Sequence, residues 1–192
     1  MTLLPLATIV TPNLDETAVL VGHAVKGLEA MQAAAESIVS QGGQVVVTGR
    51  GEARFEKALQ ALATRHPGNV GVRIGFDETE ARRMYAGSDF LLMPSRFEPC
   101  GLSQMYAQRF GSLPIAHKTG GLADTIEDDV TGFLFGDLSL TGFLGAIRRG
   151  MQAFHSQKRL HAMRKAAMSR PSGWGQSALR YHAVYNRAAI RA

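Results

Sequence analysis

The 192-residue sequence contains one cysteine, Cys100, so no disulfide can form within the chain. It has no run of about 20 apolar residues, the length that a membrane helix needs. Its first residues lack the basic flank of a secretion signal, and its six histidines show no spacing typical of a metal site. These absences exclude disulfide-stabilised and membrane-spanning classes. We therefore expect a cytoplasmic protein with no metal site and no membrane partner.

Acidic residues are missing from the last part of the sequence. Residues 1–137 hold all 16 Asp and Glu, whereas residues 138–192 hold ten of the 21 Lys and Arg. Such a segment is typical of a surface that binds an acidic partner or a polyanion, although a solvated helix face has the same composition. Its aromatic residues have the spacing of a helix core, and charge alone gives only non-specific affinity. We expect no specific nucleic-acid partner.

Apolar residues make up 45% of the sequence and charged residues 19%, as in globular proteins. Short β-branched or apolar runs alternate with helical patterns along the chain. The runs predict strands at residues 7–11, 44–48, 71–74, 90–93, 113–116 and 132–135. The helical patterns predict helices at residues 14–21, 28–40, 53–65, 78–86, 102–110, 122–126, 141–154, 157–168 and 175–189. This alternation predicts a single α/β domain over residues 1–192. Its core would be a doubly wound, Rossmann-like, six-stranded parallel sheet with helices on both faces and extra C-terminal helices.

The strand predicted at residues 90–93 runs into a loop that could bind an anion and a sugar. Gly101 permits close approach of the backbone, and the free N–H groups of Leu102, Ser103 and Gln104 would form an anion site at the start of the next helix. Glu98 could accept hydrogen bonds from sugar hydroxyls. Alternatively, Ser103 only caps the helix and Glu98 is exposed.

Two motifs in this part of the sequence resemble the bacterial glycogen synthase family. They read SRFEPCGLSQ at residues 95–104 and KTGGLADT at residues 118–125, and the likeness runs from about residue 42 to the C-terminus. That family consists of retaining glucosyltransferases of the GT-B fold that use ADP-glucose. The resemblance implies that residues 42–192 form a nucleotide-binding segment.

The resemblance also assigns roles to individual residues. Glu98 would contact the glucose hydroxyls, the backbone of Cys100 and Gly101 would lie against the sugar, and the amides of Leu102 and Ser103 would hold the diphosphate. Phe76 falls where the family commonly has Tyr against adenine, and Lys118 falls where it has Arg. The other assigned positions in the second motif are Gly120 and Gly121. ADP or ADP-glucose is the ligand that the resemblance implies, with no cofactor required.

The catalytic part of that family's pattern is incomplete. Its domain opens with a strand, an Arg and a Lys-Gly pair, and the two cations stabilise the leaving ADP. Lys26 and Gly27 match the pair, but no Arg precedes Arg50. We also expect the domain that binds the glycogen acceptor to be absent, so that the exposed cleft face could drive self-association.

The first residues resemble a different family. Residues 1–41, which are predicted to form a strand and two helices, resemble hydroxymethylpyrimidine phosphate kinase, an enzyme of the ribokinase-like fold. There Asn13 and Glu16 match a motif that helps to organise Mg²⁺ and phosphate, although both residues could equally cap the following helix. The Gly-rich anion hole of that kinase is missing.

Two enzyme families within one sheet suggest an engineered chimera with a junction near residues 41–44. In this hypothesis the chain folds but has no catalytic turnover, because fold and function are separable. The alternative is a weak ADP- or ADP-glucose-binding module that keeps half of a glucosyltransferase active site. A working glucosyltransferase or kinase ranks last because each catalytic set is incomplete.

Overall fold

The computed structural model describes residues 7–10, 27–75 and 77–189. The described elements alternate between strands and helices up to β6 and end in three consecutive helices. They are β1 (Ala7–Val10), α2 (Gly27–Ser40), β2 (Gln44–Gly49), α3 (Ala53–Arg65), β3 (Val70–Ile74), α4 (Glu78–Gly87), β4 (Phe90–Met93), α5 (Ser103–Phe110), β5 (Leu113–His117), α6 (Gly120–Thr125), β6 (Phe133–Phe135), α7 (Leu140–Phe154), α8 (Gln157–Met168) and α9 (Trp174–Ala189).

The strands lie side by side in the order β3-β2-β1-β4-β5-β6, and every neighbouring pair is parallel. The order reverses between β1 and β4, where Ile9 pairs with Val46 on one side and with Leu91 on the other. In open parallel sheets the loops at the carboxyl ends of the strands beside such a reversal form the ligand crevice. The predicted α/β class with parallel strands is confirmed.

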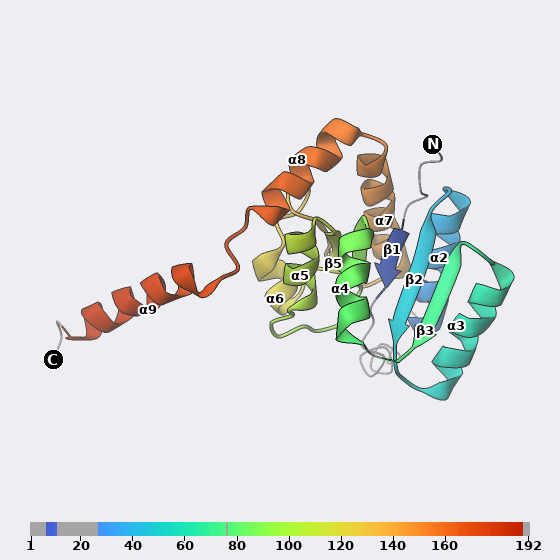
Figure 1. Cartoon of the computed structure of the whole chain (residues 1–192), viewed down its shortest axis with the longest axis horizontal. Helices are drawn as coiled ribbons and strands as arrows, with labels where there is room; N and C mark the ends of the chain where they lie inside the picture. Colours follow the sequence, from blue (N-terminus) through green and yellow to red (C-terminus); the bar gives the residue numbers. More distant parts are fainter. Residues whose placement is uncertain (1–6, 11–26, 76, 190–192) are drawn as a thin grey trace.

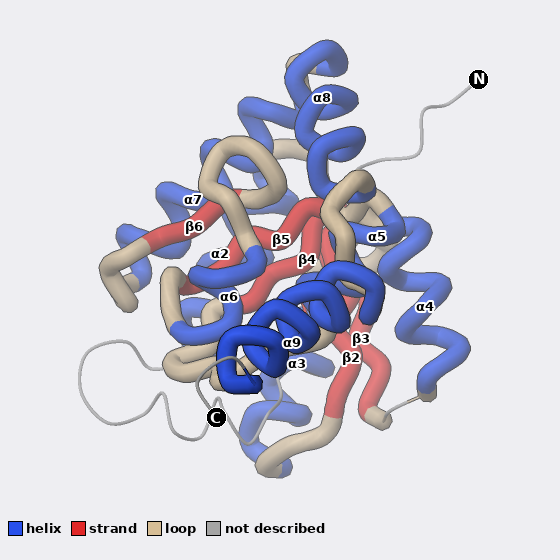
Figure 2. Tube along the Cα trace, turned by 90° about the vertical axis from the view of Figure 1, so that its left-hand side faces the viewer, coloured by secondary structure: helices blue, strands red, loops and turns tan. Residues whose placement is uncertain are grey.

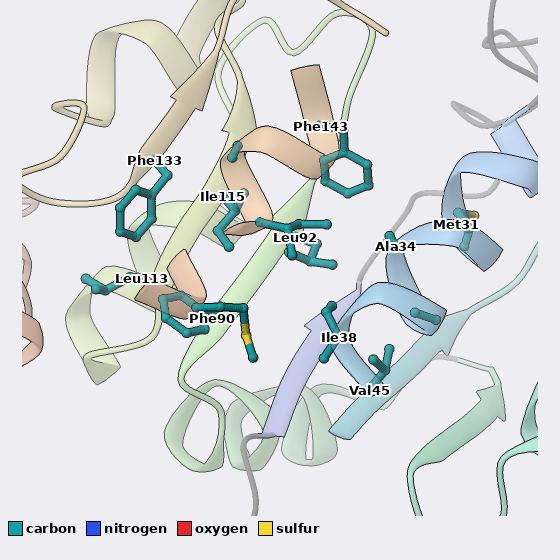
Figure 3. Close-up of a cluster of buried hydrophobic side chains, with 14 of the residues drawn as sticks. Met31, Ala34, Ile38, Val45, Phe90, Leu92, Leu113, Ile115, Phe133 and Phe143 are labelled. Carbon is teal, nitrogen blue, oxygen red and sulfur yellow. The ribbon is translucent and has the colours of Figure 1, made fainter. Parts of the chain in front are cut away.

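Helices cover both faces of the sheet (Figures 1 and 2). One layer contains α2, α3 and α7, and the other contains α4, α5 and α6. Strand β4 is buried on both sides, since Phe90 and Leu92 join the first core while Leu91 and Met93 join the second. Figure 3 shows part of the first core, in which side chains of α2 and α7 pack on those of β2, β4, β5 and β6. Strands buried on both faces explain why the sequence reads as continuous apolar runs rather than as alternating ones.

The helices and strands fall close to their predicted positions, with one instructive difference. Helix α6 begins at Gly120, whereas the sequence pattern placed its start at Leu122. The helix can begin earlier because Gly120 has a φ of 40° and lacks the side chain that would collide with the preceding loop. The helix predicted at residues 14–21 lies outside the described residues.

The three C-terminal helices differ in how they are held. Helix α7 is capped by Ser139, whose hydroxyl accepts a hydrogen bond from the Gly142 N–H at 3.1 Å, and it packs on β5 and β6. Helix α8 buries Leu160, Met163 and Ala167 in the first core. Helix α9 lies away from the sheet in Figure 1 and buries no residue. Within the described ranges, every helix is too short or too polar to cross a bilayer.

Candidate functional site

The candidate site lies at the carboxyl edge of β4 and β5. These two central strands end at Met93 and His117, and each is followed by one of the two motifs singled out in the sequence. Because the strands are parallel neighbours, their following loops meet at one edge of the sheet.

The loop after β4 is held directly against the start of α6. The Gly121 N–H donates a hydrogen bond to the Glu98 carbonyl at 2.8 Å. A Cβ atom at Gly120 would overlap the Glu98 carbonyl, and one at Gly121 would overlap the Cys100 carbonyl. Both glycines are therefore required by close backbone approach. The half-buried Glu98 sits on a fixed backbone at this edge.

The amino end of α5 is left without a side-chain cap. Its N-cap residue is Leu102, whose side chain accepts no cap hydrogen bond. Gly101, with a φ of 68°, turns the chain into the helix. The alternative in which Ser103 caps the helix is thus not what the structure has, because Ser103 is the first residue of α5 rather than its N-cap. The first N–H groups of a helix have no intrahelical acceptor, so this end suits an anion.

Gln104 lies beneath this turn and connects the two loops. Its side chain is fully buried (0% exposed), and its Nε2 donates to the carbonyls of Cys100 at 3.0 Å and Gly101 at 2.8 Å. The same nitrogen lies 3.1 Å from Thr125 Oγ1, so its two hydrogens are shared among three acceptors, and the Thr125 hydroxyl donates to the Gly121 carbonyl at 2.5 Å. One side chain therefore bonds the loop after β4 to helix α6.

A further connection involves the last residue of β5. His117 Nδ1 lies 2.9 Å from the Ser95 carbonyl, and its ring packs on Phe135 with centroids 5.5 Å apart. Because a carbonyl oxygen only accepts hydrogen bonds, Nδ1 carries the proton in this contact. The next residue, Lys118, donates its backbone N–H to the Phe135 carbonyl at 2.9 Å and exposes its side chain.

The structure brings most of the predicted site residues together at this edge. The residues of the two connected loops are Glu98, Cys100, Gly101, Leu102, Ser103, Gly120 and Gly121, and the Cys100 thiol is free and exposed. Lys118 follows β5 at the same edge. Phe76, Asn13 and Glu16 lie outside the described residues.

Sequence reasoning did not assign roles to the side chains of Gln104, Thr125 and His117. A signal for the first was present, since Gln104 and Gln108 are four residues apart on one face of a short helix. Polar residues on the buried face of a helix need hydrogen-bond partners. Gln108 is 4% exposed and donates through Nε2 to the Thr131 carbonyl at 3.2 Å.

Comparison with known proteins identifies the family. The family model described as "Glycosyl transferases group 1" matches residues 15–170. The chain belongs to this family. The family match includes both loops of the candidate site and the strands that precede them.

The relatives are glycogen synthases. The chain is 59% identical over 160 residues to the glycogen synthase of Pseudomonas syringae pv. syringae, covering 83% of this chain and 33% of that protein. It is 56% identical over 164 residues to glycogen synthase 1 of Bradyrhizobium diazoefficiens, covering 85% of this chain and 36% of that protein. The chain thus spans about a third of the length of these curated relatives.

Solved structures support the same fold. The catalytic domain of starch synthase IV from Arabidopsis thaliana, bound to ADP and acarbose, matches with a TM-score of 0.76 and 30% identity. That match covers 95% of this chain and 38% of the other. Anabaena HepE in complex with UDP-glucose matches with a TM-score of 0.65 at 17% identity, covering 86% of this chain and 43% of that one. The second likeness concerns the fold alone.

These findings overturn the chimera hypothesis and its kinase component. The family match begins at residue 15 and runs across residues 41–44, where a junction was expected. An alignment of 160 residues with one glycogen synthase is longer than residues 42–192, so it also crosses that point. The chain is related to glycogen synthases on both sides of the expected junction. The expectation of an engineered fold without turnover was wrong because a short likeness at residues 1–41 was given the weight of a separate family, and the alternative of a weak isolated binding module is not favoured either.

Proposed function

We propose that this chain supplies the nucleotide-sugar side of a glucosyltransferase active site, in an enzyme that transfers glucose from ADP-glucose to an α-glucan. The observation that carries the proposal is the bonded pair of loops at the carboxyl edge of β4 and β5. It fixes Glu98 beside an uncapped helix terminus in a chain 59% identical to a glycogen synthase.

In this proposal each group at the edge meets a part of the donor with matching chemistry. The carboxylate of Glu98 accepts hydrogen bonds from glucose hydroxyls. The first N–H groups of α5 and the exposed ammonium of Lys118 bind the diphosphate, because both offer positive charge to an anion. Phe76 is proposed to stack on the adenine ring, as an aromatic residue beside a nucleotide base can.

The reaction breaks the bond between glucose C1 and the diphosphate oxygen and forms a bond from C1 to an acceptor hydroxyl oxygen. The departing ADP takes the electron pair of the broken bond, and the proton of the acceptor hydroxyl passes to the departing diphosphate. Negative charge therefore develops on the diphosphate in the transition state. Donors already aimed at that position stabilise the charge without reorganising, which is often the largest contribution to catalysis.

One relative favours ADP over UDP as the nucleotide. The starch synthase IV structure, at 30% identity, holds ADP together with acarbose. The curated relatives are named glycogen synthases, which favours a glucan acceptor. The structure with UDP-glucose is only 17% identical and speaks for the fold alone. We accordingly propose that ADP-glucose is the donor and that the acceptor is a glycogen-like glucan.

The test uses a hybrid enzyme, since the chain spans about a third of its relatives. The aligned 160 residues of the Pseudomonas syringae glycogen synthase are replaced by those of this chain, and transfer of labelled glucose from ADP-glucose to glycogen is measured. We expect activity within about tenfold of the parent, because the exchanged segment keeps the site residues. A hybrid that folds cooperatively but transfers no glucose would refute the proposal.

The control variant in the same hybrid is Glu98→Gln, which keeps the size of the side chain and removes its charge. We expect it to lower kcat/KM for ADP-glucose by about 100-fold, in the range for a lost charged contact to the reacting sugar. Replacing ADP-glucose with UDP-glucose in the unmodified hybrid tests the choice of nucleotide. Equal rates with both donors would contradict the preference for ADP.

A further inference from the structure

We propose that Gln104 is a positioning residue for the donor site, holding the loop after β4 and helix α6 in one fixed arrangement. The proposal rests on the proposed function, since the loops that Gln104 joins are those assigned to the nucleotide sugar. It concerns a residue that does not itself reach the donor, because its side chain is completely buried beneath Gly101.

The orientation of the Gln104 amide is determined by its surroundings. Three oxygen atoms, the carbonyls of Cys100 and Gly101 and the hydroxyl of Thr125, surround Nε2 within 3.1 Å. A carbonyl can only accept, so the side-chain NH₂ group must face them. The Thr125 hydroxyl gives its own proton to the Gly121 carbonyl and therefore also accepts from Gln104. In the flipped orientation the Gln104 side-chain oxygen would face these same three oxygen atoms, none of which could donate a hydrogen bond to it.

This orientation leaves the other end of the amide without a partner. Among the described residues, Gln104 Oε1 is the one buried side-chain nitrogen or oxygen atom without a hydrogen-bond partner. A buried acceptor without a donor costs about 1–3 kcal/mol relative to a satisfied one. An apolar side chain here would avoid that cost, but it would take away the donor that Gln104 provides to the carbonyls of Cys100 and Gly101. The presence of Gln at position 104, with its unpaired oxygen, is explained if the contacts of its Nε2 are required for the shape of the loop.

The position of Gly101 depends on the same side chain. A Cβ atom at Gly101 would collide with the Gln104 amide, so the turn rests directly on that group. The turn sets the direction of the first N–H groups of α5, and the Gly121 N–H holds the Glu98 carbonyl. Gln104 thereby fixes, through its neighbours, both the anion-binding amides and the sugar-binding carboxylate of the proposed site. Displacements of about 1 Å in such groups lower rates by up to 100-fold.

The chain offers a matched control in Gln108, one turn further along α5. Its amide is also buried, and its Nε2 also contacts three oxygens, those of the Thr125 carbonyl at 3.3 Å and of the Thr131 carbonyl and hydroxyl at 3.2 Å each. These bonds tie α5 to the last residue of α6 and to the connection before β6, and none of them reaches the Cys100–Gly101 turn. Replacing either glutamine with Met removes a similar set of bonds while keeping the volume of the side chain.

The experiment compares Gln104→Met with Gln108→Met. Calorimetric titration of the hybrid enzyme with ADP-glucose gives the Kd, and exchange of the Gly121 amide hydrogen in the 192-residue chain, followed by NMR, reports the bond to Glu98. We expect Gln104→Met to raise the Kd and to accelerate that exchange by about tenfold each relative to Gln108→Met. If both variants change the Kd and the exchange rate by the same factors, the proposal is overturned. That result would mean that Gln104 only stabilises the fold, as Gln108 does.

A second pair of variants keeps the test decisive if Gln104→Met does not fold. Thr125→Val removes the hydroxyl between Gln104 and Gly121 at nearly constant shape, whereas Thr125→Ser retains it. Faster Gly121 exchange in the Val variant, with recovery in the Ser variant, supports the coupling, and the same exchange in both refutes it. If the unmodified hybrid enzyme folds but neither binds nor uses ADP-glucose, the proposed function fails. The exchange measurements still decide whether Gln104 holds the loops together.

Discussion

The connected loops after β4 and β5 and the terminal helix α9 differ in where their side chains find contacts. In the loops, backbone carbonyls, glycines and the Gln104 amide contact one another within the chain. In α9, Trp174, Tyr181 and Tyr185 are exposed, and no residue of the helix is buried. The loops therefore have a shape that the chain itself determines, whereas α9 draws its stability mainly from its own backbone bonds. Substitutions should be costly in the first region and nearly neutral in the second.

The largest difference is expected for the removal of a leucine side chain. Leu122 of α6 is fully buried in the core beneath the loops, while Leu179 of α9 is 72% exposed. Leu122→Ala leaves a cavity and should lower the free energy of unfolding by about 2–5 kcal/mol. Leu179→Ala should change it by less than about 0.5 kcal/mol. Urea denaturation of both variants measures the difference, and a loss above about 1 kcal/mol for Leu179→Ala would show that α9 is packed after all.

A methyl group added to the loop region gives the next largest effect. The Cβ of Gly121→Ala would overlap the Cys100 carbonyl, and a backbone group cannot rotate away as a flexible side chain can. We expect a loss of about 2–3 kcal/mol, as for other overpacked sites. Thermal unfolding followed by far-ultraviolet circular dichroism would record it. Gly136→Ala is the control, because no atom lies within 4 Å of a Cβ at that position.

Sequence patterns predicted the helices and strands well because the buried faces of these elements require apolar residues at a regular spacing along the chain. The strands of the central sheet read as apolar runs, and the capping residues Asp77 and Ser139 mark the starts of two helices. The motif residues of the site also fell together, because parallel strands bring their following loops to one edge. Contacts between the two loops were not predictable in this way. The bond from Gly121 to Glu98 and the three contacts of Gln104 depend on a fit that no local pattern encodes.

The sequence led to a wrong prediction where the short resemblance of residues 1–41 to a kinase was given as much weight as the long resemblance of the remaining residues to glycogen synthase. Residues 1–41 suggested a second family, yet the family match continues through them from residue 15. A motif of a few residues, such as Asn13 with Glu16, is as typical of the start of a helix as it is of a metal site. Extended agreement over 160 residues carries far more information.

An intermediate effect is expected where α8 is attached to the sheet. Arg164 pairs with Asp89 at the start of β4 and donates through Nε to the Gly111 carbonyl at 3.1 Å. Both side chains of the pair are mostly buried, so Arg164→Met leaves the Asp89 carboxylate without this partner and should cost about 1–2 kcal/mol. Arg187→Met on α9 is the matched control, since Arg187 donates to the Ala183 carbonyl of its own helix. Equal urea midpoints for the two variants would contradict the prediction.

The smallest effect concerns α9 alone and separates the two regions most directly. Gly175 lies in the first turn of α9, where a Cβ atom would meet no other atom within 4 Å and the backbone angle is not left-handed. Gly175→Ala should stabilise the helix by about 0.5–1 kcal/mol through backbone entropy and leave the unfolding of the sheet unchanged.

The chain has a single tryptophan, Trp174, and it lies in this helix, so tryptophan fluorescence reports α9 while circular dichroism mainly reports the remaining elements. If α9 is independent, its fluorescence transition is broad, precedes the cooperative transition and shifts upward in the Ala variant. A single transition seen by both probes, shifted equally by the substitution, would mean that α9 and the sheet unfold as one unit, and the contrast between the two regions would no longer hold.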